Sequence, residues 1–117
     1  MKRRIYVAYT GGTIGMKPST QGYVPVKGHL TQSIQSTPDF QRAEMPSFTI
    51  HEYQPLIDSS NMTPGDWQRI ADDIMDNYDK YDGFVVLHGT DTMAYTASAL
   101  SFMFKNLSKP IIVTGSQ

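Results

Sequence analysis

The chain has 117 residues, of which 39% are hydrophobic and 18% charged, with five Phe, seven Tyr and one Trp. These values predict one folded domain, and because no apolar run reaches the ~18 residues of a membrane-spanning helix, a spanning segment is excluded. The absence of cysteine excludes disulfides and thiolate catalysis, and the formal net charge of -1 gives no support for a nucleic-acid or membrane partner.

The first half of the chain predicts a strand, a helix and a second strand. Arg4–Tyr9 is apolar and rich in strand-forming residues, and it stops at the turn Thr10–Gly12. A weaker helix is predicted at His29–Ser36, ending before Pro38 because the residue preceding a proline is disfavoured in the α conformation. Ser47–Tyr53 alternates between polar and apolar residues, which predicts a strand.

A stronger helix signal follows Thr63. Thr63 is a good N-cap, Pro64 suits the first helical position, and Asp66 stands three residues after the cap. Apolar residues then recur at helical spacing as far as Tyr78. Four aspartates lie off this apolar stripe, and we expect them on a solvated face: Asp72, Asp73, Asp76 and Asp79.

The last third of the chain predicts a strand, a helix and a final strand. Gly83–His88 and Ile111–Thr114 are short apolar runs, typical of strands buried in a parallel sheet. Between them, Thr92–Asn106 carries apolar residues around most of its circumference, so we expect a largely buried helix.

The complete order of strands and helices predicts an α/β fold, an open and mostly parallel sheet with flanking helices. A four-stranded sheet that ended at Gln117 would leave an edge strand or a face uncovered, so we expect the chain to be a fragment. Each predicted strand is followed by a polar, glycine-containing or hydroxyl-rich segment: Thr10–Gly15, Asp58–Asn61, His88–Thr92 and Thr114–Gln117. Ligands of open α/β sheets bind beyond the carboxyl ends of the strands, and we therefore expect one site there.

Each of these segments also has a purely structural interpretation. Gly11–Gly12 fits a tight turn and lacks the nucleotide-binding fingerprints, Gly89–Thr92 fits a helix cap, and Asp58–Ser60 fits a turn. His88 closes an apolar strand and is expected to be a buried, hydrogen-bonded histidine. No histidine has the spacing of a metal ligand, so no metal or cofactor is expected.

Taken together, the motifs resemble the bacterial type I, cytoplasmic L-asparaginases. The segments that carry this resemblance are Tyr9–Gly15, Gln21–Tyr23, Asp58–Ser60 and His88–Leu100. The resemblance implies that residues 1–117 are the N-terminal part of the large α/β domain, and that the remainder and a smaller C-terminal domain are absent from this chain. It also implies a cytoplasmic homotetramer, built as a dimer of dimers.

The resemblance implies hydrolysis of L-asparagine to L-aspartate and ammonia through a threonine acyl-enzyme. By position, Thr13 resembles the nucleophile and Tyr23 the flap tyrosine that hydrogen-bonds to it. Thr90 resembles the second threonine, and Asp91 the residue that receives the substrate α-ammonium and orients Thr90. Which threonine attacks first is left open.

Substrate contacts and two departures also follow from the resemblance. Three residues match the positions that hold the substrate α-carboxylate, and a fourth stands where a loop carbonyl receives the side-chain amide: Asp58, Ser59 and Ser60, and then Ser116. The relay lysine of such enzymes comes from beyond Gln117, so the chain alone is expected to be inactive. Asn61 stands where members often carry an acidic residue.

Two further interpretations and one flexible segment complete the sequence predictions. The same loops suit a non-catalytic amino-acid-binding domain. They also suit the asparaginase-like subunit of an archaeal tRNA amidotransferase, although such subunits usually carry an extra N-terminal domain. Ile14–Val26 has the glycine and proline content of a mobile loop that closes over a substrate.

Overall fold

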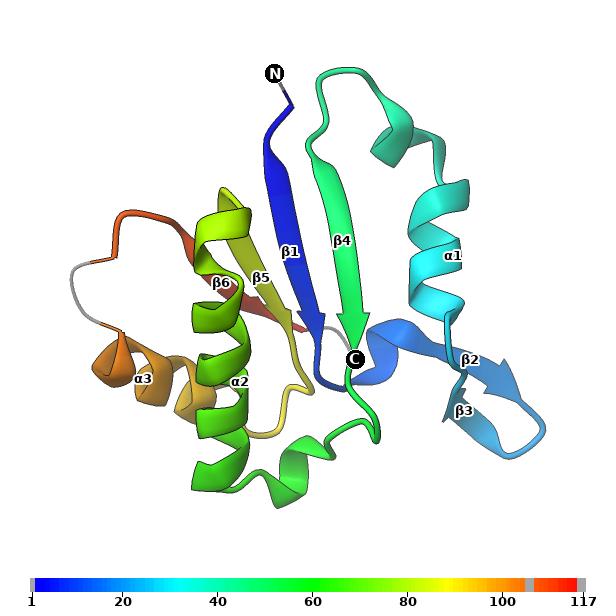
Figure 1. Cartoon of the computed structure of the whole chain (residues 1–117). Helices are drawn as coiled ribbons and strands as arrows, with labels where there is room; N and C mark the ends of the chain where they lie inside the picture. The colour runs from blue at the N-terminus through cyan, green and yellow to red at the C-terminus, as the bar shows by residue number, and fades with distance from the viewer. Residues whose placement is uncertain (1, 105–106, 116–117) are drawn as a thin grey trace.

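The structure, a computed structural model, describes residues 2–104 and 107–115. Its centre is a four-stranded sheet with the order β4-β1-β5-β6, in which every neighbouring pair is parallel (Figure 1). The strands are β1 (Arg4–Tyr9), β4 (Ser47–Glu52), β5 (Gly83–Leu87) and β6 (Ile111–Thr114). The predicted fold class, an open and mostly parallel α/β sheet with flanking helices, is confirmed.

Helices cover both faces of the sheet. They are α1 (His29–Ser36), α2 (Pro64–Asp76) and α3 (Met93–Met103). Along β1, Tyr6 and Ala8 pack with α2 and α3, whereas Val7 and Tyr9 pack on the other face with α1. Figure 1 shows α1 on one side of the sheet and α2 and α3 on the other. The alternation of side chains along one strand thus produces three layers.

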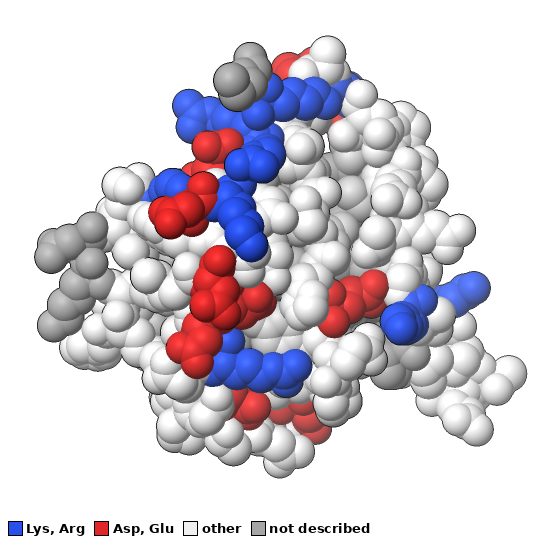
Figure 2. All heavy atoms as spheres, viewed as in Figure 1, with Lys and Arg blue, Asp and Glu red and all other residues white. Residues whose placement is uncertain are grey.

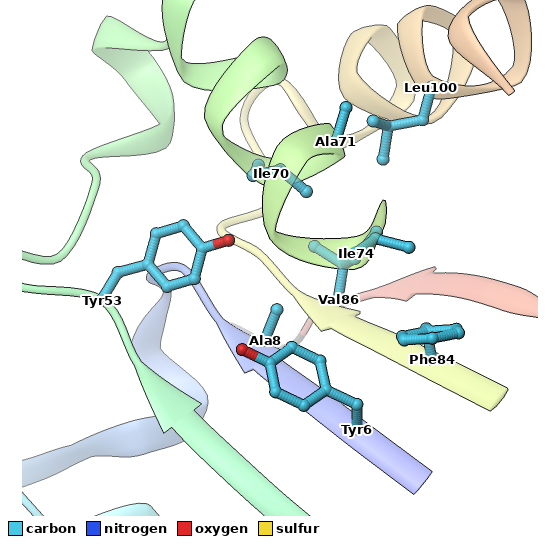
Figure 3. Close-up of a cluster of buried hydrophobic side chains, with 9 residues drawn as sticks. All are labelled: Tyr6, Ala8, Tyr53, Ile70, Ala71, Ile74, Phe84, Val86 and Leu100. Carbon is cyan, nitrogen blue, oxygen red and sulfur yellow. The ribbon is translucent and has the colours of Figure 1, made fainter. Parts of the chain in front are cut away.

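The larger core lies between the sheet and the helices α2 and α3. Figure 3 shows Ile70 and Ile74 on the side of α2 that faces the sheet, and Ala71 directed toward Leu100 of α3. Ile70 and Ile74 are completely buried. Complete burial stabilises the folded state by about 1.5–3 kcal/mol for each such side chain, so this contact fixes α2 on the sheet.

The start of α2 is the capping arrangement that the sequence predicts. The Asp66 N–H donates to Thr63 Oγ1 at 3.3 Å, and the Thr63 N–H donates to Asp66 Oδ2 at 2.9 Å. Pro64 occupies the first helical position. Two N–H groups that would otherwise lack a partner at the helix start are therefore satisfied.

The acidic face of α2 is less uniform than predicted. Figure 2 shows Asp and Glu side chains gathered over the part of the surface where α2 lies. Asp72, Asp76 and Asp79 are exposed, as expected. The prediction is wrong for Asp73, which is half-buried and accepts hydrogen bonds at 2.7 Å from the hydroxyls of both Tyr6 and Tyr53. This carboxylate joins α2 to β1 and to the residue after β4.

The expectation of a largely buried helix after Thr92 is also wrong. Thr96 and Leu100 are the buried residues of α3, whereas Tyr95 is 68% and Phe102 77% exposed. The helix packs against α2 and β6 along one stripe, and the apolar side chains on its other sides reach solvent. The apolar circumference of a helix does not by itself decide its burial, because burial also needs a neighbour on each side.

The segment predicted as a loop at 14–26 is mostly a hairpin. It contains the antiparallel strands β2 (Met16–Ser19) and β3 (Gly22–Pro25), which follow a 3₁₀ turn, η1 (Thr13–Gly15). Three more 3₁₀ turns are η2 (Pro38–Gln41), η3 (Ser59–Asn61) and η4 (Tyr78–Lys80). Within residues 2–104 and 107–115, no helix combines the length and the apolar character that are needed to cross a membrane.

Candidate active site

Backbone hydrogen bonds join the segment after β1 to its two neighbours. The N–H and the hydroxyl of Thr10 both donate to the Leu87 carbonyl, at 3.0 and 2.7 Å. The Ile57 N–H donates to the Thr10 carbonyl at 2.7 Å. Thr10 is buried, and its hydrogen bonds hold the end of β5 and the segment before Asp58 against the first loop.

Glycines allow these segments to approach more closely than other residues would. A Cβ atom at Gly11 would lie 2.2 Å from the Ile57 carbonyl oxygen. Gly12 has a φ of 98°, and a Cβ there would lie 2.9 Å from the His88 carbonyl oxygen, which a Cβ at Gly115 would approach to 2.2 Å. The segments that follow β1, β5 and β6 thus meet around one backbone carbonyl, at the carboxyl edge of the sheet.

The first loop rests on Tyr9, which is almost fully buried. The Tyr9 hydroxyl donates to the Gly12 carbonyl at 3.0 Å, and Gly15 lies against the Tyr9 ring, where a Cβ would come within 2.3 Å. Burial, assisted by the charge of Glu52, raises the pKa of Tyr9 and keeps this phenol protonated as a donor. Thr13 begins η1 directly after Gly12, so its backbone is set by this support.

The segment after β4 is organised by Asp58. Its Oδ1 atom accepts from the hydroxyl and the N–H of Ser60, at 2.8 and 3.1 Å, and its Oδ2 atom accepts from Asn61 Nδ2 at 3.2 Å. The hydrogen bonds from Ser60, with a smaller contribution from Asn61, lower the pKa of Asp58. Ser59 begins η3 between them. Asn61 therefore stabilises the Asp58 carboxylate, whereas an acidic side chain at position 61 would repel that carboxylate.

The second loop begins at a completely buried histidine, as predicted. His88 Nδ1 lies 2.6 Å from the Gly89 carbonyl oxygen, and Nε2 lies 2.8 Å from Thr96 Oγ1. The chain then rises to the surface through Thr90, which is partly buried, and Asp91, which is exposed. Both residues precede α3, so they stand beside the carboxyl end of β5.

Two predicted site residues are not brought into this cluster by the described structure. Tyr23 lies on β3, opposite Pro18, and is 63% exposed. Figure 1 shows the hairpin that carries it extending away from the sheet. Its hydrogen bond to the nucleophile remains a prediction. Ser116 lies outside the described residues.

Comparison with known proteins identifies the family. Residues 4–117 match the family described as Asparaginase, N-terminal. The chain belongs to this asparaginase family. L-asparaginase 1 of Escherichia coli strain K12 is 72% identical over 116 residues, which are 99% of this chain and 34% of that protein.

Solved structures of asparaginases share the fold of this family member. L-asparaginase I from Vibrio cholerae superposes with a TM-score of 0.90 at 71% identity, covering 100% of this chain and 35% of that one. A probable cytoplasmic L-asparaginase from Campylobacter jejuni gives a TM-score of 0.74 at 30% identity, covering 97% of this chain and 32% of that one. The chain therefore spans about a third of the length of these relatives.

Sequence reasoning missed the residues that support the loops of this asparaginase-family site. Tyr9 was part of a recognised motif, but nothing in the sequence indicates that its hydroxyl reaches forward to Gly12. Trp67 Nε1 donates to Thr96 Oγ1 at 2.9 Å, which links α2 to α3 and to His88. Trp67 lies 29 residues before Thr96 in the sequence, so no local spacing pattern could have revealed the contact.

Proposed function

We propose that this chain is the N-terminal part of the large α/β domain of a whole protein that hydrolyses L-asparagine to L-aspartate and ammonia. The observation that carries this proposal is the 72% identity, over nearly the whole chain, to a protein named L-asparaginase 1. The meeting of the strand-end segments around the His88 carbonyl supports it, because it gives the two threonine-bearing loops a common base.

In the proposed mechanism Thr13 is the nucleophile: its hydroxyl oxygen bonds to the side-chain amide carbon of asparagine, the C–N bond breaks, and ammonia leaves with the hydroxyl proton. Water then hydrolyses the resulting ester, which releases L-aspartate and restores the threonine. A neutral hydroxyl is a weak nucleophile and needs a neighbouring base or relay. We assign that relay to Thr90 and Asp91, which follow the buried end of β5. The role of Thr13 draws support from its place directly after Gly12, which lies against the second loop.

The substrate is held by its charged ends in this proposal. The Asp91 carboxylate accepts hydrogen bonds from the α-ammonium group, as charge-assisted pairs require. The segment Asp58–Ser60 holds the α-carboxylate, and Ser116 marks the loop whose carbonyl receives the side-chain amide. Because Asp58 is itself anionic, its hydrogen bonds to Ser60 and Asn61 orient this segment rather than attract the substrate carboxylate.

The β2–β3 hairpin is proposed as the lid of the site. It projects from the sheet and carries Tyr23 on an exposed position. Closure would bring Tyr23 toward Thr13 and exclude water from the reacting groups. A paired hairpin moves as one unit, so the lid closes by rotation at its ends rather than by ordering of a loop.

We also propose that the whole protein is a cytoplasmic homotetramer, a dimer of dimers, which acts without a cofactor. The Campylobacter jejuni relative is described as cytoplasmic.

The test is the release of ammonia from L-asparagine by the whole protein and its variants. Thr13→Ala and Thr90→Val are each expected to lower kcat by about a thousandfold or more, as for groups that act as one unit. Thr49→Val, an equivalent change on an exposed position of β4, is the control and should leave kcat unchanged.

Near-normal rates in both site variants would refute the assignment. Binding of aspartate or asparagine to the unmodified protein, with no ammonia produced, would instead favour an amino-acid-binding domain without turnover.

A further inference from the structure

We propose that His88 is a positioning residue, which uses one ring nitrogen to fix the peptide between Gly89 and Thr90. This inference rests on the proposed function, since Thr90 and Asp91 follow that peptide. His88 has no exposed surface, so its ring cannot itself contact a substrate in this conformation. Its effect must therefore pass through the backbone of the second loop.

The donor and the acceptor in each hydrogen bond of the His88 ring follow from the partner atoms. A carbonyl oxygen can only accept, so the contact of 2.6 Å with Gly89 requires a hydrogen on Nδ1. At the other end an indole N–H can only donate, so Thr96 Oγ1 accepts from Trp67 and is free to give its own hydrogen to Nε2, 2.8 Å away. A neutral ring with its hydrogen on Nδ1 therefore gives each of these donors and acceptors a partner.

The backbone of His88 is fixed independently of its ring. Its N–H donates to the Thr114 carbonyl at 3.0 Å, and its carbonyl is enclosed by Gly12 and Gly115. Nδ1 is thus held at a fixed position relative to the sheet, because the main chain is hydrogen-bonded to Thr114 and the ring to Thr96.

The anchored ring in turn sets the direction of the second loop. The peptide unit is planar and trans, so the Thr90 N–H points opposite to the Gly89 carbonyl that Nδ1 holds. Rotation of this peptide would redirect the chain at Thr90 and move its hydroxyl and the Asp91 carboxylate. A misplacement of about 1 Å in a catalytic group can reduce a rate by about 100-fold.

Two substitutions in the whole protein distinguish the role of Nδ1, which contacts Gly89, from that of Nε2, which contacts Thr96. His88→Asn places an amide N–H near the position of Nδ1 and retains a donor for Gly89, whereas His88→Gln reaches toward Thr96 and loses that donor. We expect both to lower the thermal midpoint, and we expect kcat for asparagine to be about tenfold or more lower in His88→Gln than in His88→Asn.

The control is Trp67→Phe, which removes the N–H that donates to Thr96 Oγ1 and leaves both hydrogen bonds of the His88 ring in place. It should lower the thermal midpoint without a matching fall in kcat. Equal kcat values in the Asn and Gln variants, or a fall in Trp67→Phe as large as that in His88→Gln, would overturn the inference.

A measurement on the unmodified protein covers the case in which the variants do not fold. The ¹⁵N signals of the His88 ring should show a protonated Nδ1 and an unprotonated Nε2 at pH 7. The opposite tautomer or a doubly protonated ring would overturn the inference even if asparagine is hydrolysed. Absence of ammonia release from the unmodified protein would refute the proposed function, and the positioning role with it.

Discussion

Asp73 shows how one side chain can hold three elements together. Its carboxylate accepts hydrogen bonds from Tyr6 of β1 and from Tyr53 after β4, while Asn77 Nδ2 donates to it at 3.2 Å. The guanidinium of Arg69 lies 4.5 Å above the Tyr53 ring. Burial, followed by the hydrogen bond to Asp73, raises the pKa of both tyrosines, because each phenol must stay protonated to donate.

Tyr53→Phe is expected to lower the free energy of unfolding of the whole protein at pH 7 by about 1–3 kcal/mol, since a hydrogen bond to a charged group is lost. The raised pKa in the folded state means that this contribution is complete below pH ~10, where tyrosine ionises in an unfolded chain. It declines as the pH rises above that value, so the deficit of the variant should shrink there.

Urea denaturation of both proteins at pH 8 and above pH ~10 measures how the deficit in the free energy of unfolding changes with pH. Tyr95→Phe, on an exposed position of α3, is the control and should change the free energy of unfolding little at either pH. A deficit for Tyr53→Phe that grows with pH would contradict the explanation.

At the scale of elements, three segments that have glycine or proline close to their ends show the predicted boundaries. Arg4–Tyr9, His29–Ser36 and Ile111–Thr114 form elements with the predicted bounds, because glycines and prolines mark their ends. The hairpin at 16–25 could not be predicted from composition. Proline weakens a strand by removing an N–H donor, yet both strands of an isolated pair are edge strands, which tolerate Pro18 and Pro25.

The capping box of α2 is a prediction at this scale. Thr63→Ala removes the acceptor for the Asp66 N–H and should lower the free energy of unfolding by about 1 kcal/mol. Denaturant titration of the whole protein measures this loss. Thr20→Ala, at the exposed tip of the β2–β3 hairpin, provides the comparison and should have an effect within about 0.5 kcal/mol. Equal stability of the two variants would show that the cap is not needed.

At the scale of the whole molecule, the sequence predicted that the polar segments lie at one edge of the sheet, but not how closely they approach one another. The polar segments were identified because they follow strands, and parallel strands bring their carboxyl ends to one edge. Their actual spacing depends on contacts between distant residues, such as Thr10 with Leu87 and Gly115 with His88, which no local pattern encodes. For the same reason the exposure of α3 could not be predicted, since burial depends on what else packs there.

The chain expressed alone is expected to release no ammonia from L-asparagine. The resemblance places a lysine of the catalytic relay beyond Gln117, and the apolar surface of α3 is partly uncovered. The assay compares purified chain with the whole protein at equal molar concentration, with circular dichroism to verify that the chain is folded. Turnover by the folded chain above the background of a Thr13→Ala version would contradict this expectation.

The crowding around the His88 carbonyl restricts how this protein can be redesigned. Even a methyl group at Gly12 or Gly115 would force strand ends apart, so altered selectivity cannot be obtained by enlarging those residues. In the protruding hairpin a Cβ at Gly22 would meet no atom within 4 Å, so crowding is absent there, although a φ of 92° still favours glycine at that position. Laboratory evolution for new amide substrates should therefore accumulate its successful changes on the hairpin and leave both glycines untouched.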